Sequence, residues 1–343
     1  PNFQLQVGQA SAILVEPSSA ENNANKPVGT GPYTLGSWSK GSSLTLDKWP
    51  AWRDADKVAL RRVTFRFVSE APAQTTALLA GDIDLIPHAS VSRSLPQFER
   101  DKRFQVLINN SLGKAILAIN NRKAPLNDVR VRGAIGAATD RQAVIGAAMD
   151  GRGVPMGSHY VPSLPGYVDT TGVNPFDIEK AKRLLAEAGV KTPLELNFVV
   201  PPPPYARQGS ELIAAQLARI GIVARIQNVE WAQWLSGTYG NKNYDLTLIL
   251  HVEPFDLDNF AKPDYYWGYQ SPRFNELFEK ARTSAREADR LRHLGEAQRL
   301  LAEDSVHAWL FQPQFITVAR QGLRGLWKDL PILANDLAAL SWR

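Results

Sequence analysis

Apolar and polar residues alternate along much of the first third of the chain, and this spacing predicts β-strands. Thr34 to Trp38 and Ser43 to Trp49 alternate in this way, with Gly41 between them as the turn of a hairpin. Val63 to Val68 repeats the pattern, whereas Ala71 to Ala80 has the spacing of a helix that stops at a glycine. The first part of the chain therefore mixes antiparallel strands with short helices.

The middle of the chain adds two apolar strands and then helical segments. Phe104 to Asn109 and Ala115 to Asn120 are short apolar runs that predict strands. Asp128 to Asp150 has helical spacing, and Asp177 to Ala188 is an amphipathic helix that ends at Gly189.

A strand, a helix and a second strand follow closely on one another. They are Leu194 to Val200, Ala206 to Ile220 and Ile222 to Val229. This order is typical of a βαβ unit, in which the two strands are parallel and the crossover is right-handed. We expect the chain to be of the α/β class.

The last part of the chain returns to the same two kinds of element. Trp231 to Tyr239 predicts a short helix and Tyr244 to His251 a strand. Two long helices, Pro272 to Ala285 and Glu287 to Ser305, precede a strand over Trp309 to Arg320. With 343 residues, 44% of them hydrophobic, the chain exceeds a typical single domain and predicts two lobes.

Charge and cysteine content exclude several classes of function. The formal net charge is +5, but the basic residues are scattered and form neither a stripe nor a nucleic-acid-binding motif. The chain has no cysteine, which excludes disulfides, thiolate metal sites and a cysteine nucleophile. No apolar run is long enough for a membrane span, and Pro1 to Gln9 lacks the features of a signal peptide. If the protein is secreted, we expect this sequence to show it without its leader.

Motifs of cofactor-dependent and hydrolytic enzymes fail when they are tested against the sequence. Gly29 to Thr34 begins like a dinucleotide loop, but Thr34 replaces the third glycine and Pro32 stands where helix amides should begin. No phosphate-binding loop and no nucleophile elbow is present. We therefore expect no cofactor, no catalytic residues and no enzymatic activity.

Acidic residues gather where the predicted strand over Tyr244 to His251 ends. Glu253, Asp256 and Asp258 follow that strand, and the carboxyl ends of strands are common ligand sites in α/β proteins. No base or nucleophile accompanies them, so they suit an ammonium or guanidinium group, or else cap the loop. His251 and Glu253 alternate and are expected on one face, but a third metal ligand is not evident, so no metal site is predicted.

Aromatic residues surround this acidic segment in the sequence. They include Trp231, Trp234, Tyr239 and Trp267. Aromatic rings provide large contact areas and can face cations, so the group indicates a ligand wall, although each ring taken singly favours core packing.

A series of motifs resembles family 5 of the extracellular solute-binding proteins. The motifs occur in the family's order, and they are Pro27-Val28-Gly29-Thr30-Gly31-Pro32-Tyr33, Ala80-Gly81-Asp82-Ile83-Asp84, Pro125-Leu126-Asn127-Asp128-Val129-Arg130-Val131-Arg132, Asp140-Arg141, Glu179 to Gly189, and Ile220-Gly221-Ile222 through Glu230-Trp231 to Tyr244-Asp245-Leu246.

The resemblance implies a periplasmic, two-lobed clamshell of the extended type II class, which closes by a hinge on a solute. Such a protein delivers a peptide or amine-bearing ligand to the permease of an ABC importer, catalyses nothing and acts as a monomer that binds no nucleic acid. A sugar, an opine or a metal chelate is the alternative ligand, and an α/β hydrolase is the alternative from another class.

The resemblance also implies roles for single residues. Glu253, or Asp256 in a shifted alignment, would hold the amino terminus of a peptide, and His251 would lie on the same face. Trp231 would line a side-chain pocket and Tyr205 would lie in the cleft. Trp267 belongs to the aromatic group that we expect beside them.

The chain departs from the family in length and in one motif. Family members carry about 150 further residues before the Pro27 to Tyr33 motif, so lobe one is expected to be incomplete and its ability to bind is in question. Lobe one comprises residues 1–119 and 311–343, and lobe two comprises 120–310. Asp256-Leu257 replaces the family's Asp-Pro, which leaves the ligand class open.

Overall fold

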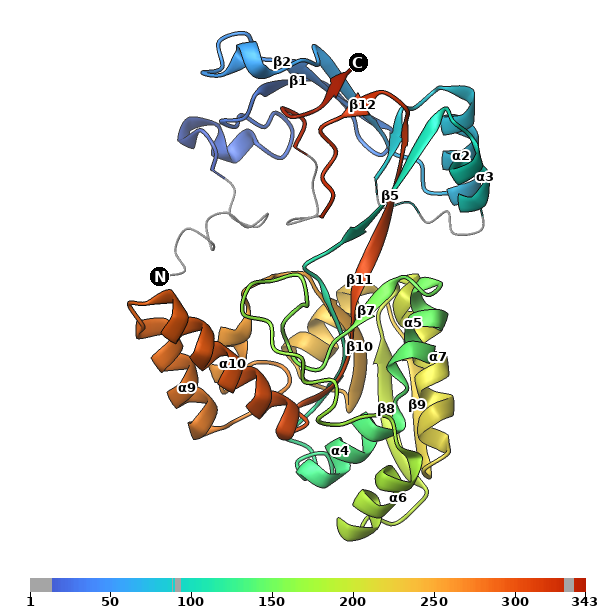
Figure 1. Cartoon of the computed structure of the whole chain (residues 1–343), viewed down its shortest axis with the longest axis vertical. Helices are drawn as coiled ribbons and strands as arrows, with labels where there is room; N and C mark the ends of the chain where they lie inside the picture. Colours follow the sequence, from blue (N-terminus) through green and yellow to red (C-terminus); the bar gives the residue numbers. More distant parts are fainter. Residues whose placement is uncertain (1–13, 88, 90–93, 330–335) are drawn as a thin grey trace. The chain divides into compact units, whose positions relative to one another are not determined.

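The computed structural model describes residues 14–87, 89, 94–329 and 336–343. These residues form two compact units (Figure 1). The larger unit comprises residues 112–314, and the smaller unit comprises the described residues of 14–111 and 315–343. The sequence placed residues 112–119 and 311–314 in the other lobe. They lie in the larger unit because β6 (Lys114–Ile119) pairs with the start of β11 (His307–Arg320).

A mixed sheet forms the centre of the larger unit. Its strand order is β11, β6, β10, β8 and β9, and the short β7 pairs with β11. The strands not yet given are β7 (Gly153–Pro155), β8 (Leu194–Val200), β9 (Ile222–Asn228) and β10 (Leu246–His251). β6 is antiparallel to both of its neighbours, whereas β8 and β9 are parallel over their whole length. The predicted βαβ unit is confirmed in its order and strand direction, with α7 (Pro204–Ala218) as its helix.

Helices cover both faces of this sheet. On one face lie α4 (Val129–Ala138), α5 (Arg141–Met149), α6 (Ile178–Glu187) and α7; on the other lie η4 (Leu257–Ala261), α9 (Pro272–Thr283) and α10 (Glu287–Glu303). Figure 1 shows α5 and α7 beside β8 and β9, with α9 and α10 on the opposite side.

The alternation along β6 shows how one strand contributes to both cores. Ala115, Leu117 and Ile119 pack against the first group of helices. Ile116 and Ala118 pack against the second group. Successive side chains of a strand point to opposite faces, so a strand between two helical layers must be apolar throughout. β6 is fully buried, and only its first residue, Lys114, breaks the apolar run.

Aspartates mark where the helices on the first face begin. Asp128 accepts a hydrogen bond from the main chain of Arg130, and Asp177 accepts one from that of Lys180. Asp140 accepts from the main chains of Gln142 and Ala143, and so it begins a new helix within the region predicted as helical from 128 to 150. That region is therefore two helices, α4 and α5.

The segment predicted as one short helix over Trp231 to Tyr239 has two parts. Trp231–Gln233 forms α8, and Trp234–Gly240 continues as the π-helix η3. Glu230 and Gln233 form a capping box at the start, in which the side chain of each accepts from the main chain of the other. A π-helix shifts the side chains that follow it, and such turns are common at functional sites.

The smaller unit contains a separate antiparallel sheet and a small α/β core. β1 (Tyr33–Ser39), β2 (Ser43–Lys48) and β3 (Arg62–Arg66) form the sheet, with Gly41 at positive φ in the first turn, as predicted. The core lies where β4 and β5 pair with the end of β11. The remaining elements are η1 (Pro17–Asn22), η2 (Ala55–Lys57), α2 (Ala71–Ala80), β4 (Leu85–Ile86), α3 (Leu95–Arg100), β5 (Phe104–Asn110), β12 (Leu323–Arg324) and β13 (Ser341–Trp342).

Helices long and apolar enough to cross a membrane are absent from the residues that the structure describes.

Two isoleucines of β9 provide a matched test of the packing. Ile222 is fully buried, whereas Ile226 is 37% exposed on the same strand. We expect Ile222→Ala to lower the free energy of unfolding by about 2–5 kcal/mol, because it leaves a cavity between α7 and the sheet. Ile226→Ala should cost about 1 kcal/mol or less. Urea denaturation of both variants measures the difference, and equal losses would contradict the assignment of the core.

Candidate functional site

The candidate site begins where β10 ends. β10 pairs with β8 at Leu246. Further along the same strand, the main-chain amide of Leu250 donates to the Tyr205 hydroxyl, 2.9 Å away. Burial raises the pKa of Tyr205 to about 12, so its hydroxyl remains protonated at neutral pH. Tyr205, predicted as a cleft residue, therefore caps one edge of β10 with its hydroxyl oxygen.

Lys114 lies opposite the last residue of β10. It is the first residue of β6, and its backbone partner across the two strands is His251. Its side chain is only 1% exposed. The Lys114 ammonium donates to Oδ1 of Asp256 at 2.8 Å and to the main-chain carbonyl of Glu253. A lysine is rarely buried this deeply unless it is paired with an anion.

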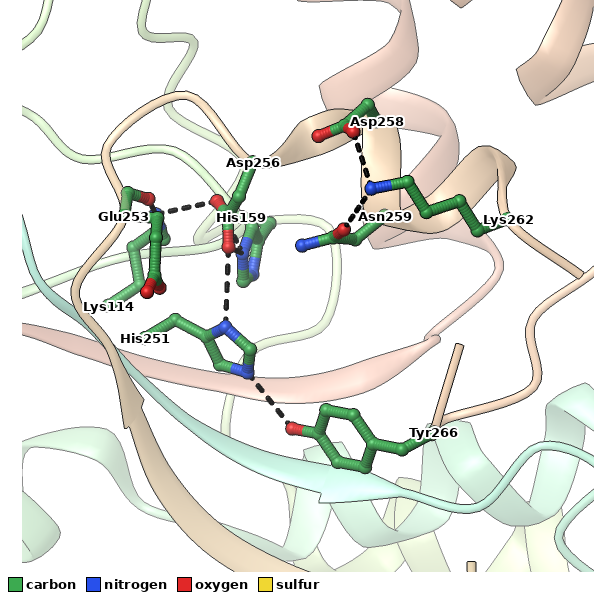
Figure 2. A network of polar contacts seen from close by, with 9 residues as sticks. All are labelled: Lys114, His159, His251, Glu253, Asp256, Asp258, Asn259, Lys262 and Tyr266. Atoms are coloured by element: carbon green, nitrogen blue, oxygen red, sulfur yellow. Dashed lines mark hydrogen bonds and ion pairs between the residues drawn. The ribbon is translucent and has the colours of Figure 1, made fainter. Parts of the chain in front are cut away.

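Asp256 is the anion at the centre of this group (Figure 2). Nε2 of His159 lies 3.0 Å from both carboxylate oxygens, and Nδ1 of His251 lies 3.3 Å from Oδ2. Burial acts to raise the pKa of Asp256. The neighbouring His159 and Lys114 oppose burial, as do hydrogen bonds from both histidines, and together they hold this pKa well below its usual value. Asp256 therefore stays ionised, with its oxygens occupied by protein donors.

The two histidines of this network serve as donors. Burial lowers the pKa of His159 to about 4, although the charge of Asp256 acts in the opposite direction. His159 is thus neutral near pH 7 and can donate from Nε2. His251 Nε2 lies 2.9 Å from the Tyr266 hydroxyl, and burial raises the pKa of Tyr266 well above its usual value. The phenol can donate to Nε2, which leaves the Nδ1 proton of His251 for Asp256.

The same side chains have the composition of a metal site. His159, His251 and Asp256 each offer a ligand atom, and these atoms lie within 4.8 Å of one another. A divalent cation at this place would lie close to the Lys114 ammonium, which is already 2.8 Å from Asp256. Lys114 and Asp256 balance each other's charge, and the histidines complete the hydrogen bonding. The arrangement favours a network of ion pair and hydrogen bonds over a metal centre. We name Lys114, His159, His251, Asp256 and Tyr266 the buried network.

Glu253 lies beside the buried network but does not share it. Its side chain is exposed, and Figure 2 shows its carboxylate pointing away from that of Asp256. The prediction that His251 and Glu253 lie on one face is wrong, because β10 ends at His251 and the chain turns before Asp256. His251 points into the buried network, and Glu253 presents to solvent a carboxylate without a donor in the described part of the chain.

The aromatic residues divide into a buried set and an exposed set. Trp267 is fully buried and stacks on Phe260, with ring centroids 4.4 Å apart, so it is a core residue beneath the site. Trp231 and Tyr239 are each 43% exposed. Trp231 contacts Trp234, and Tyr239 contacts both Trp234 and Tyr265. We name Trp231, Trp234, Tyr239 and Tyr265 the aromatic ridge, in which the buried Trp234 supports the exposed rings of Trp231 and Tyr239.

One residue of the ridge, Tyr265, lies within the electrostatic influence of the acidic segment. Burial is the main cause that raises the pKa of Tyr265, and the nearby Tyr239, Asp256 and Glu253 raise it further. Tyr265 therefore lies close enough to Glu253 to sense its charge. Tyr265 thus associates the aromatic ridge with Glu253. Tyr205, His251, Asp256 and Trp267 instead make their contacts within the protein.

Sequence reasoning missed two essential members of the buried network. His159 lies in the loop after β7, far from His251 in the chain, and no local pattern connects them. Lys114 carried a signal, since it is a charged residue at the head of an otherwise apolar strand. A charge in that position requires a buried partner, and Asp256 provides it.

Comparison with known proteins identifies one family and several relatives. Residues 1–273 match the family of bacterial extracellular solute-binding proteins, family 5 Middle. The chain is 31% identical over 259 residues to the heme-binding protein A of Haemophilus influenzae, covering 73% of this chain and 46% of that protein. It is 25% identical over 309 residues to the dipeptide-binding protein of Escherichia coli, covering 84% and 57%. The chain therefore spans about half the length of these curated relatives.

A solved structure shows the fold. The ABC transporter-associated periplasmic binding protein DppA from Helicobacter pylori, in complex with the peptide STSA, matches with a TM-score of 0.85 at 22% identity. The match covers 99% of this chain and 70% of that one. The predicted fold class, the α/β fold of a two-lobed periplasmic binding protein, is confirmed.

Two buried histidines predict how stability changes with pH. Burial lowers the pKa of His159 to about 4 and that of His307 well below its usual value. Below about pH 6.5 the unfolded chain takes up protons that the folded protein does not. Stability should therefore fall between about pH 7 and pH 5, by up to about 1.4 kcal/mol per pH unit for each histidine.

Urea denaturation across this pH range measures the slope. His307 Nδ1 accepts from the main chain of Ile119 at 3.2 Å, and the amide oxygen of His307→Asn, attached at the corresponding position, can replace that acceptor. This variant loses the ring contacts with Phe260, Trp267 and Trp309 and should be less stable at every pH, but it should lose about half of the pH dependence. An unchanged slope would show that His307 takes up a proton in the folded state.

Proposed function

The chain belongs to family 5 of the bacterial extracellular solute-binding proteins, and we propose that it captures a peptide or another amine-bearing solute outside the cytoplasm. The dipeptide-binding protein of Escherichia coli and the peptide complex from Helicobacter pylori support a peptide as the ligand. In this proposal the two compact units are the two lobes, and the captured solute passes to the permease subunits of an ABC importer.

The exposed carboxylate of Glu253 carries the proposal. Among the described residues no donor occupies it, whereas Asp256 is buried and accepts from Lys114, His159 and His251. An ammonium group seated against Glu253 would gain a charge-assisted hydrogen bond. The aromatic ridge beside it offers large, rigid surfaces for the adjoining part of the ligand. Glu253 is therefore our choice for the charge partner, ahead of Asp256.

The proposal involves binding without catalysis. The histidines of the buried network both already face Asp256, and Lys114 is paired with the same carboxylate. General base catalysis needs a group within hydrogen-bonding reach of the substrate proton. We accordingly propose a monomeric binding protein with no cofactor and no nucleic-acid partner. The hinge closure predicted from the sequence stays a prediction.

A metal chelate is the second candidate ligand. It is favoured by the 31% identity to the heme-binding protein A of Haemophilus influenzae. The aromatic ridge suits a flat macrocycle as well as a peptide side chain. Titration with haemin, followed by its absorbance, separates this candidate from peptides, and calorimetric titration with sugars and opines tests those two ligand classes.

Glu253→Gln tests the charge partner. We expect the variant to bind the dipeptide Ala-Phe about thirtyfold more weakly than the unaltered protein, a loss of about 2 kcal/mol, because the amide carries no charge. Isothermal titration calorimetry measures this loss. The unaltered protein should bind N-acetyl-Ala-Phe about thirtyfold more weakly than Ala-Phe, because acetylation removes the charge of the amine. Equal affinity of the variant and the unaltered protein for Ala-Phe would refute the assignment.

Glu230→Gln is a matched control, since Glu230 is an exposed acidic residue whose ion pair with Arg207 is distant, at 3.5 Å. Its side chain also accepts in the capping box of α8, and the amide oxygen of the variant can still accept there. It should bind Ala-Phe like the unaltered protein. Trp231→Ala tests the aromatic ridge separately. It should weaken Ala-Phe by about 1–3 kcal/mol without altering the discrimination between free and acetylated amines.

A further inference from the structure

Lys114 directs both of its hydrogen bonds to one short segment. The ammonium donates to the carbonyl of Glu253 and to the carboxylate of Asp256, three residues later. These two contacts bracket the turn that leads from β10 into η4. Lys114 itself is fixed at the head of β6, in register with the last residue of β10. The lysine thus joins the rigid sheet to the turn that carries Glu253.

The turn has little other support for its main chain. Residues 252 and 253 lie outside any helix or strand. Within the described part of the chain, the bond from Lys114 is the hydrogen bond that holds the main chain of Glu253. A side chain on a segment without regular structure is positioned only as well as its backbone is held. The location of the Glu253 carboxylate therefore depends on Lys114.

The positive charge of Lys114 is balanced by a partner within the protein. Asp256 lies 2.8 Å from the ammonium and balances its charge, and both side chains are buried. Lys114 can consequently lie next to Glu253 without neutralising its carboxylate. Figure 2 shows this geometry, with the Lys114 nitrogen between the Glu253 backbone and Asp256.

We propose that Lys114 is a positioning residue that fixes Glu253 and thereby sets the preference of the site for ligands with a free ammonium group. This inference rests on the proposed function, in which Glu253 receives that group. Lys114 touches no ligand in this account and acts only through the turn. Substitution of Lys114 should reduce the preference for ligands with a free ammonium group. It should change the affinity for ligands that lack an amine much less.

The experiment compares the dipeptide Ala-Phe with N-acetyl-Ala-Phe by calorimetry. Lys114→Met alone leaves Asp256 as an unpaired buried charge, so folding is protected by combining it with Asp256→Asn, whose amide oxygen still accepts from both histidines. We expect this double variant to lose about tenfold or more of the discrimination between the two peptides. Affinity for N-acetyl-Ala-Phe should change by less than about threefold.

Two matched variants make the result specific. Asp256→Asn alone leaves the Lys114 ammonium buried without its anion, so this control should have a lower melting temperature. The Lys114 bond to the Glu253 carbonyl remains, and the folded variant should retain most of the discrimination. Lys123→Met removes a lysine that is paired with Asp245 at 3.0 Å and does not contact the turn, and it should bind both peptides like the unaltered protein.

The outcomes separate this inference from the proposed function. If Glu253→Gln abolishes discrimination but the double variant keeps it, and only its melting temperature changes, Lys114 has a purely structural role and the inference is overturned. If the unaltered protein itself does not distinguish the two peptides, the proposed function fails and the inference fails with it. Loss of discrimination in both the Glu253 and the Lys114 variants supports both.

Discussion

The structure of the site depends on a single requirement, that a lysine ammonium buried in the core must have an anion beside it. Removing a charge from water costs several kcal/mol, and its partner recovers this only with good geometry and further hydrogen bonds. Asp256 meets the requirement for Lys114, and His159 and His251 occupy its remaining acceptor positions. Such a pair contributes little net stability compared with apolar packing, but its two charged groups must keep one geometry. The pair therefore restricts the path of the main chain between the end of β10 and Asp256.

The sheet makes this arrangement possible. β6 lies between β10 and β11 and is covered by helices on both faces, so its first residue is buried even though it is charged. Antiparallel pairing sets Lys114 against His251, and the loop after β7 brings His159 to the same point. Three segments that are distant in the sequence thus meet at the end of one strand. Trp267 and Phe260 close the space beneath them with stacked rings.

Local sequence signals predicted the elements well and their exact ends less well. The helix over Ala71–Ala80 and the strand over Leu194–Val200 were located correctly, because a glycine and a proline tract bound them. The division of residues 128–150 at Asp140 was missed, since a capping aspartate is hard to distinguish from a surface residue within a helical pattern. The face of Glu253 was predicted wrongly, because strand alternation was extended past the last paired residue.

The candidate site was only partly visible in the sequence. Glu253, Trp231 and the neighbouring aromatic residues lie close together along the chain, so their grouping could be recognised. The participation of Lys114 and His159 depends on strand register and on a long loop, which no local pattern encodes. Burial separates Trp267 from Trp231, and a similar sequence context could not reveal that difference.

The Tyr205 cap on β10 has a consequence for any extended chain that lies along this strand. The phenol already satisfies the main chain of Leu250, and Lys114 already satisfies the carbonyl of Glu253. Pro254, the next residue, has no amide hydrogen to offer. These three positions therefore offer a guest fewer main-chain hydrogen bonds than a fully open strand would. A guest that lies along them must obtain more of its affinity from its end group and side chains.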